Sequence, residues 1–328
     1  MTKIFPYLGD NNPDSSFTLL LVSEGYLSGD SMKFASDCMD FVEQLLRTAP
    51  FSLSRINPNW LSIYSHFTPS NTSGTAIGAS TVGRTAFQSA YDETSKTLML
   101  DQSSVNSFLN TVQLTQFGTA RPFSSFMDSG DQSYGPTATL VMFLIPPLSG
   151  HPEGSEMKSV PSADADYYFC ATTTDQLWHQ VVFRAMCDSL GLGDEFELDG
   201  PDYLAPVPDQ NNSFTMEFNL KYSDVVPTTA KFMPDWAPIF NATQRLLPIP
   251  VHSKSGTPAT PDNSIEQPAL FHPDIEYWEG GGGYRTKVYR TAADCLMRRK
   301  FGSSELPIRA NEISFCPACY YFLKVLIR

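Results

Sequence analysis

The chain has 328 residues, enough to bury a sizeable core as one large domain or two modest ones. Its 35 acidic and 22 basic residues give a net charge of −13, which argues against nucleic acid or an anionic membrane as a partner. No apolar run reaches the roughly 18 residues of a membrane span. Because the N-terminus lacks the apolar core of a signal peptide, we expect a cytoplasmic protein or non-classical secretion.

The first half of the chain alternates apolar strands with amphipathic helices. Apolar periodicity predicts strands at 17–26, 59–67, 137–145 and 166–173, and helices at 28–49 and 105–112. The 137–145 segment is the most apolar run and is expected to be the central strand. A strand, a helix and a second strand of this size favour neighbouring parallel strands. We therefore predict an α/β fold with a mixed, mainly parallel sheet.

A further helix is predicted over 176–190, where apolar residues recur at helical spacing. Asp175 is expected to cap its start, and Gly191 to end it in a left-handed conformation. A metzincin-type zinc site uses such a helix for a His, a general-base Glu and a second His, followed by a Gly and a third ligand. Gly191 and Asp194 stand at the last two of these positions.

The other positions of this zinc motif are degenerate. Arg184 stands at the first His, Ala185 at the Glu and Asp188 at the second His. A register that starts from His179 also fails, because neither following position matches. Arg184 is a fixed cation that repels a metal, and we expect it to pair with Asp188 or Asp194. Ala185 cannot activate water, and loss of a general base costs about 10²–10⁴-fold in rate.

The amino-acid composition of the sequence changes after this helix. Residues 199–262 are rich in Pro, Asn, Asp and Ser, with one strand candidate at 213–222, which is typical of a subdomain or a lid. We expect an N-terminal α/β subdomain over 1–198, which ends in the degenerate zinc-site helix. A Pro-rich connection and a smaller C-terminal subdomain are expected over 199–328.

Six cysteines are present, and three of them are close in the C-terminal sequence. Cys316-x-x-Cys319 resembles a redox or zinc motif, but a zinc ribbon needs a second pair and only Cys295 lies nearby. Cys295 could bridge to one of the pair in an oxidising compartment, whereas all would be buried thiols in a cytosol. We favour a structural role and leave the disulfide state open.

Several short motifs follow one another along the chain. Their residues are Gly25, Tyr26, Phe34, Asp37, Pro50, Phe51, Thr85, Phe87, Ser89, Tyr91, Asp92, Asp194, Glu195, Phe196, Glu279, Tyr284, Tyr289, Arg290, Asp294, Cys295, Met297, Phe315, Cys316 and Cys319. In this order they resemble the IgA-specific metallopeptidases, a metzincin-like family of zinc peptidases. The resemblance implies a metzincin-like fold. It makes Asp194 the third ligand and Met297 the Met-turn residue beneath the metal site.

The resemblance and the degenerate motif together indicate a catalytically inactive metallopeptidase-like protein. We expect it to keep the former substrate cleft for binding a peptide, a protein or a glycan, without a cofactor. Glu279, Tyr284, Tyr289 and Met297 are the residues expected at this cleft.

Two alternatives from other functional classes remain open. The first is an active hydrolase that binds zinc in a site rebuilt around His179, Asp188, Asp194 and Glu195. The second is a structural or storage protein, which the low charge and the high proline content allow. Bound metal would favour the hydrolase, and a filled cleft would favour storage.

Overall fold

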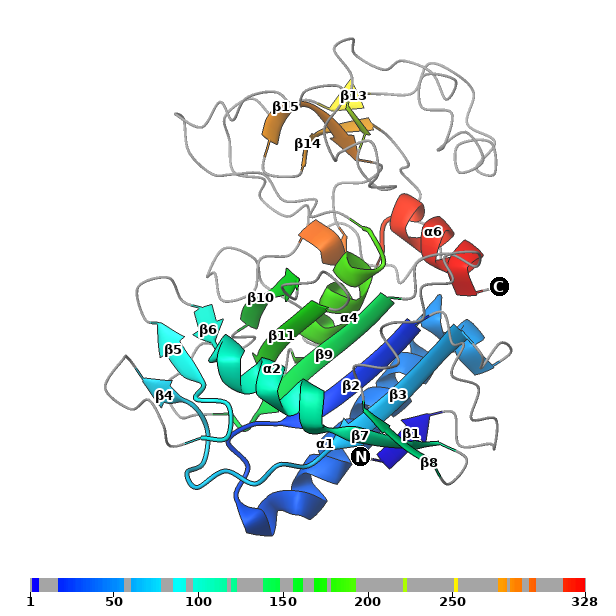
Figure 1. Cartoon of the computed structure of the whole chain (residues 1–328). Helices are drawn as coiled ribbons and strands as arrows, with labels where there is room; N and C mark the ends of the chain where they lie inside the picture. Colours follow the sequence, from blue (N-terminus) through cyan, green and yellow to red (C-terminus); the bar gives the residue numbers. More distant parts are fainter. Residues whose placement is uncertain are drawn as a thin grey trace. The chain divides into compact units, whose positions relative to one another are not determined.

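The computed structural model describes residues 2–5, 17–55, 60–77, 85–92, 97–116, 119–122, 138–147, 156–161, 168–175, 178–192, 221–222, 251–252, 277–281, 284–290, 295–298 and 315–327. The chain divides into two compact units, Met1–Leu190 with Ile327–Arg328, and Gly191–Leu326 (Figure 1). The subdomain boundary expected after residue 198 lies outside the described residues. In the part of the chain that the structure describes, no helix is long and apolar enough to cross a membrane.

The first unit is built on a six-stranded sheet with the order β1-β3-β2-β9-β11-β10. The four inner strands are parallel, and β1 and β10 pair antiparallel at the two edges. Its strands are β1 (Thr2–Phe5), β2 (Phe17–Ser23), β3 (Leu61–His66), β9 (Ala138–Ile145), β10 (Glu156–Pro161) and β11 (Tyr168–Thr173). The predicted α/β class and mainly parallel sheet are confirmed, and the most apolar run is one of the two central strands.

The two central strands are apolar on both faces because helices cover both faces. Alternate residues of β2, β9 and β11 face one cluster that also contains the buried side of α2 (Gln102–Thr111). Residues of this cluster include Leu20, Val22, Val141, Phe143, Phe169, Val105 and Leu109. The predicted helix at 105–112 begins earlier than expected, because the Asp101 carboxylate accepts a hydrogen bond from the Ser104 N–H and caps it.

The opposite face of the sheet carries α1 (Ser31–Arg47) and α4 (Trp178–Ser189), as Figure 1 shows. A 3₁₀ turn, η1 (Ser28–Asp30), precedes α1, and a second, η2 (Phe51–Arg55), follows it. The ring of Phe183 on α4 lies 5.4 Å from Phe41 of α1 and 5.1 Å from Phe51 of η2, measured between centroids. The two helices therefore share one apolar layer beneath the sheet.

Smaller elements extend the α2 face. A three-stranded sheet has the order β4-β5-β6, and a hairpin pairs β7 with β8. These strands are β4 (Ala76–Ile77), β5 (Ala90–Asp92), β6 (Thr97–Met99), β7 (Gln113–Gln116) and β8 (Thr119–Pro122). They are short, which explains why periodicity does not reveal them in the sequence.

The carboxyl end of β2 is held by a buried acidic side chain. The Glu24 carboxylate is fully buried and accepts hydrogen bonds from the backbone N–H groups of Phe87 and Ser89, each at 3.0 Å. The Glu24 N–H donates to the Leu144 carbonyl at 2.9 Å, which joins β2 to the end of β9. Gly25 follows in the left-handed region with φ +70°.

The second unit contains a four-stranded sheet with the order β12-β15-β14-β13. Its strands are β12 (Lys221–Tyr222), β13 (Val251–His252), β14 (Tyr277–Gly281) and β15 (Tyr284–Arg290). Gly281 at the end of β14 pairs with Tyr284 at the start of β15. The unit also has a 3₁₀ turn, η9 (Leu296–Arg298), and the helix α6 (Pro317–Ile327).

We predict that Gly25→Ala destabilises the protein, whereas Gly29→Ala does not. A Cβ at Gly25 would collide with the backbone of Gly74 and would need a left-handed conformation, while a Cβ at Gly29 meets nothing within 4 Å. The free energy of unfolding should fall by at least about 3 kcal/mol for Gly25→Ala and change by less than about 1 kcal/mol for Gly29→Ala. Urea denaturation measures both, and equal stabilities would contradict the placement of Gly25.

Candidate functional site

The helix α4 carries the degenerate zinc motif and is buried on nearly all sides. Gln180, Val182, Phe183, Met186 and Cys187 are at most 1% exposed. Arg184 and Ala185, at the first-ligand and general-base positions, are only 7% and 6% exposed. Apolar packing on every side explains why this segment forms a stable helix with modest amphipathicity.

Both ends of α4 bear on the sequence predictions. Gly191 has φ +90° directly after the last turn, and the Leu190 N–H donates to the carbonyls of Met186 and Cys187, so the predicted glycine stop is confirmed. The helix begins at Trp178, three residues after Asp175. The Asp175 carboxylate accepts a hydrogen bond from the Thr173 hydroxyl at 2.6 Å.

The residues of α4 do not fit a zinc ion. Zinc takes nitrogen, sulfur or oxygen ligands, whereas the first-ligand position holds the buried cation of Arg184. The methyl group of Ala185 has no atom that accepts a proton, and the adjacent Ala185 carbonyl already accepts a 2.8 Å hydrogen bond from Ser189. Asp188 is partly buried and lies one turn beyond Arg184 on α4. The predicted pairing of these two side chains stays a prediction. The other candidates, Asp194 and Glu195, lie outside the described residues.

His179 is packed as an aromatic side chain. Its ring is stacked on Phe41 with centroids 6.3 Å apart and lies 4.0 Å from the ring of Trp178. Burial lowers the pKa of His179 from 6.5 to about 4, so the ring is neutral at pH 7. Its Nε2 has no hydrogen-bond partner among the described residues.

His179 and Asp188 are too far apart to bind one metal ion together. They are nine residues apart on α4, which corresponds to about 13 Å along the axis and to opposite faces of the helix. A rebuilt zinc site that uses both residues is therefore excluded by the geometry of the helix. Asp188 remains available to a site that does not include His179.

The carboxyl ends of β2 and β9 form the switch point of the sheet, where an open α/β sheet usually binds its ligand. Here the Glu24 carboxylate binds the backbone of the 85–89 segment through hydrogen bonds. Beside it, the Tyr26 hydroxyl donates to Asp37 of α1 at 2.6 Å and lies 3.4 Å from the Thr174 hydroxyl. Burial raises the pKa of both Tyr26 and Asp37. At the switch point, hydrogen bonds of these polar groups therefore hold neighbouring segments of the chain together.

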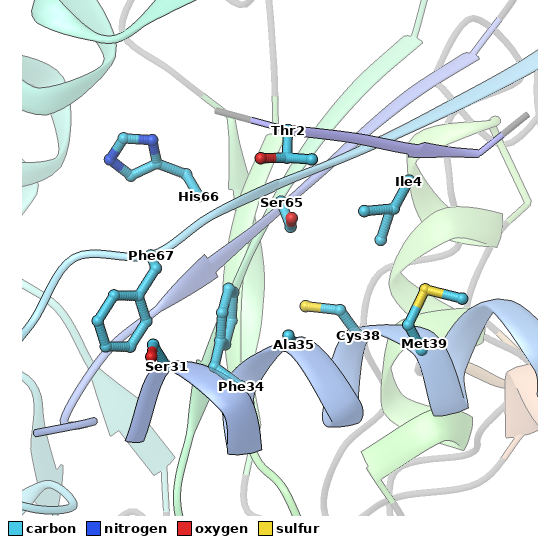
Figure 2. Close-up of a pocket in the computed structure, with 10 residues that line it drawn as sticks. All are labelled: Thr2, Ile4, Ser31, Phe34, Ala35, Cys38, Met39, Ser65, His66 and Phe67. Carbon is cyan, nitrogen blue, oxygen red and sulfur yellow. The ribbon is translucent and has the colours of Figure 1, made fainter. Parts of the chain in front are cut away.

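A cavity of about 430 Å³ lies between α1 and the strands β1 and β3 (Figure 2). Ile4, Phe34, Met39 and Phe67 give it a largely apolar lining. Cys38 also lines it and is 1% exposed, and burial raises the pKa of this thiol. The thiol thus stays protonated, and the cavity suits an apolar group better than a reaction.

The candidate cleft residues lie in the second unit. Glu279 stands opposite Tyr289 in the register of β14 and β15, and Tyr284 begins β15. Met297, the expected Met-turn residue, is fully buried in η9. Whether these residues form a cleft stays a prediction.

The structure also brings together three sulfur atoms that the sequence analysis did not combine. The Sγ atoms of Cys295, Cys316 and Cys319 lie within 4.8 Å of one another. No other group of three or more potential metal-ligating residues is found among the described residues. The signal in the sequence was the Cys-x-x-Cys pair with Cys295 nearby, which could not show that all three sulfur atoms meet.

Comparison with known proteins assigns no family to the chain. No family model matches it, and no curated protein matches it. The resemblance to the IgA-specific metallopeptidases therefore rests on the motif residues of the sequence. Any function has to be argued from those motifs and from the chemistry of the placed side chains.

We predict that the stability of the protein falls as the pH is lowered from 6.5 to about 4, in part through His179. The folded ring has a pKa of about 4 and the unfolded ring one of 6.5, so the unfolded chain binds the proton first as the pH is lowered. The contribution of His179 to the free energy of unfolding is fully present above pH 6.5 and is lost as the pH falls to about 4. It amounts to about 2–3 kcal/mol.

A comparison with His179→Phe isolates this contribution from the titration of other groups. The free energy of unfolding of both proteins is measured by urea denaturation between pH 7.5 and pH 4.5. The wild type should lose stability relative to the variant as the pH falls. A difference between the two proteins that does not change with pH would contradict the lowered pKa.

Proposed function

We propose that the protein is a catalytically inactive, metallopeptidase-like binding protein with a metzincin-like fold. The observation that carries this proposal is the side-chain set of α4, where a buried cation and a methyl group stand in place of a zinc ligand and a general base. A zinc peptidase needs both functions, since zinc polarises the scissile carbonyl and the base activates water.

The fold supports the proposal. A mixed, mainly parallel sheet carries α4 on one face, at the place in the chain where the resemblance expects the zinc-site helix. Several motif residues also have a clear structural reason in the first unit. Gly25 lets the chain pass close to the backbone of Gly74, where a side chain would collide. The N–H groups of Phe87 and Ser89 donate hydrogen bonds to the Glu24 carboxylate. Such residues are retained when the fold is kept, whatever becomes of the catalytic groups.

The ligand we propose is an extended peptide, a protein segment or a glycan. Binding would use the strands β14 and β15 in the second unit, which carry Glu279, Tyr284 and Tyr289. Tyrosine suits this purpose because it offers a large apolar ring and a hydrogen-bonding hydroxyl at low entropic cost. The net charge of −13 favours ligands that are neutral or positively charged.

The proposal predicts saturable binding of peptides or glycans without cleavage. Fluorescence anisotropy with labelled peptide and oligosaccharide libraries measures binding, and mass spectrometry of the recovered ligand detects cleavage. Binding should persist after a brief EDTA treatment that removes catalytic zinc but leaves the protein folded. Tyr289→Ala should weaken binding at least about tenfold, as expected for loss of an aromatic contact.

Met32→Ala provides the matched control, because Met32 is 80% exposed on α1 in the first unit. This variant should bind as the wild type does. Cleavage that EDTA abolishes would overturn the proposal in favour of an active hydrolase. Failure to bind any peptide or glycan would overturn it in favour of a structural or storage protein.

A further inference from the structure

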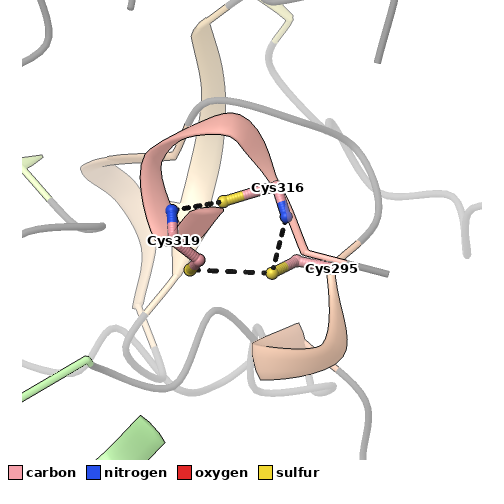
Figure 3. Close-up of side chains that lie close together, drawn as sticks. All are labelled: Cys295, Cys316 and Cys319. Atoms are coloured by element: carbon pink, nitrogen blue, oxygen red, sulfur yellow. Dashed lines mark hydrogen bonds between the residues drawn. The ribbon is translucent and has the colours of Figure 1, made fainter. Parts of the chain in front are cut away.

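The three clustered cysteines come from two segments of the second unit. Cys295 directly precedes η9, whereas Cys316 precedes α6 and Cys319 lies in its first turn (Figure 3). All three side chains are 0% exposed. The sulfur atoms therefore converge in the interior of this unit, although Cys295 and Cys319 are 24 positions apart in the chain.

The distances between the sulfur atoms suit a single tetrahedral metal ion. The Sγ atoms of Cys295 and Cys319 lie 3.7 Å apart. Two thiolates bound to one zinc ion at about 2.3 Å, at the tetrahedral angle, have their sulfur atoms about 3.8 Å apart.

Backbone groups are already directed at the sulfur atoms. The Cys316 N–H donates to the Cys295 sulfur at 3.2 Å, and the Cys319 N–H donates to the Cys316 sulfur at 3.4 Å. These donors favour the thiolate form, and the nearby N-terminus of α6 adds a positive field. Without a cation the buried thiols would stay protonated, so metal binding has to displace their protons.

A disulfide is a poorer account of the same group. One bridge engages two of the three cysteines and leaves the third as a fully buried thiol beside it. No disulfide joins any of the six cysteines in the structure. A metal ion would use all three sulfur atoms and both backbone donors, so it explains more of the arrangement.

We propose that Cys295, Cys316 and Cys319 bind one zinc ion in a structural site. The three sulfur atoms supply three of the four positions of a tetrahedral zinc ion, which ties η9 to the start of α6. Zinc suits this place because thiolates are soft ligands and a closed, buried site matches structural zinc. This proposal does not depend on the proposed function, since the site uses none of the residues of α4.

The structural site makes the second unit depend on zinc for its stability. Zinc-dependent units gain their folding free energy from the metal, and chelators unfold them. We therefore expect zinc to copurify with the protein at about one ion per chain. Elemental analysis after dialysis against a buffer with a weak chelator measures this content.

Titration of the wild type with a mercurial reagent tests the ligands without any substitution. Zinc should be released in proportion as three thiols react, and the release is followed with a metal-sensitive dye. Replacement by cobalt(II) provides a second measurement, because cobalt bound to thiolates has intense charge-transfer absorption in the near ultraviolet. These measurements remain valid even if a cysteine variant fails to fold.

Substitutions then locate the site. Cys295→Ala and Cys319→Ala should each lower the zinc content by at least about tenfold, whereas the control Cys170→Ala, in the first unit, should retain one zinc ion. Three outcomes would overturn the proposal: full zinc retention by both ligand variants, stoichiometric copper in place of zinc, or a disulfide among the three cysteines in unreduced peptides. Absence of zinc from the wild type, even after refolding with zinc, would also overturn it.

The two proposals fail independently of each other. Loss of zinc from Cys295→Ala supports the zinc site whatever happens to ligand binding, because the strands of the proposed binding site lie in the unit that the ion stabilises. Ligand binding by the zinc-loaded wild type tests the proposed function. Zinc that remains in this variant, together with cleavage that EDTA abolishes, would instead place the metal at an active site. The zinc content of the wild type alone therefore does not decide the function.

Discussion

The buried carboxylate of Glu24 holds together the place where the two central strands end. Its oxygen atoms accept the N–H groups of Phe87 and Ser89, and its own N–H bonds to the carbonyl of Leu144. Removing a carboxylate from water costs several kcal/mol unless hydrogen-bond donors replace the water. The 85–89 segment therefore has to stay beside β2, and Gly25 allows the chain to turn there against Gly74.

The arrangement of the first unit follows from this constraint. The 85–89 segment places Phe87 against Phe143 of β9, with ring centroids 4.7 Å apart, and against Phe108 of α2 at 5.1 Å. This packing closes one face of the sheet, while α1 and α4 close the other through Phe41 and Phe183. The switch point, which is the usual ligand site of an open α/β sheet, is thus used for structural bonds.

The two candidate metal sites of the chain differ in the chemistry of their side chains. On α4 the glycine stop at Gly191 stands where the resemblance expects it, but Arg184 and Ala185 supply neither a ligand nor a base. At the start of α6, Cys316 and Cys319 meet Cys295 with backbone donors directed at the sulfur atoms. Under our proposals, the chain has lost zinc from catalysis and uses zinc to stabilise its second unit.

The sequence alone determined the α/β class, the central strand, the parallel pairing of β2 with β3 and the end of α4 at Gly191, because these depend on local periodicity and on the conformational freedom of glycine. It did not reveal the short edge strands β1 and β10, whose pairing is decided by neighbours distant in the chain. It left open whether Cys295 meets both Cys316 and Cys319. That relation depends on packing between segments distant in the chain, which only the tertiary structure decided.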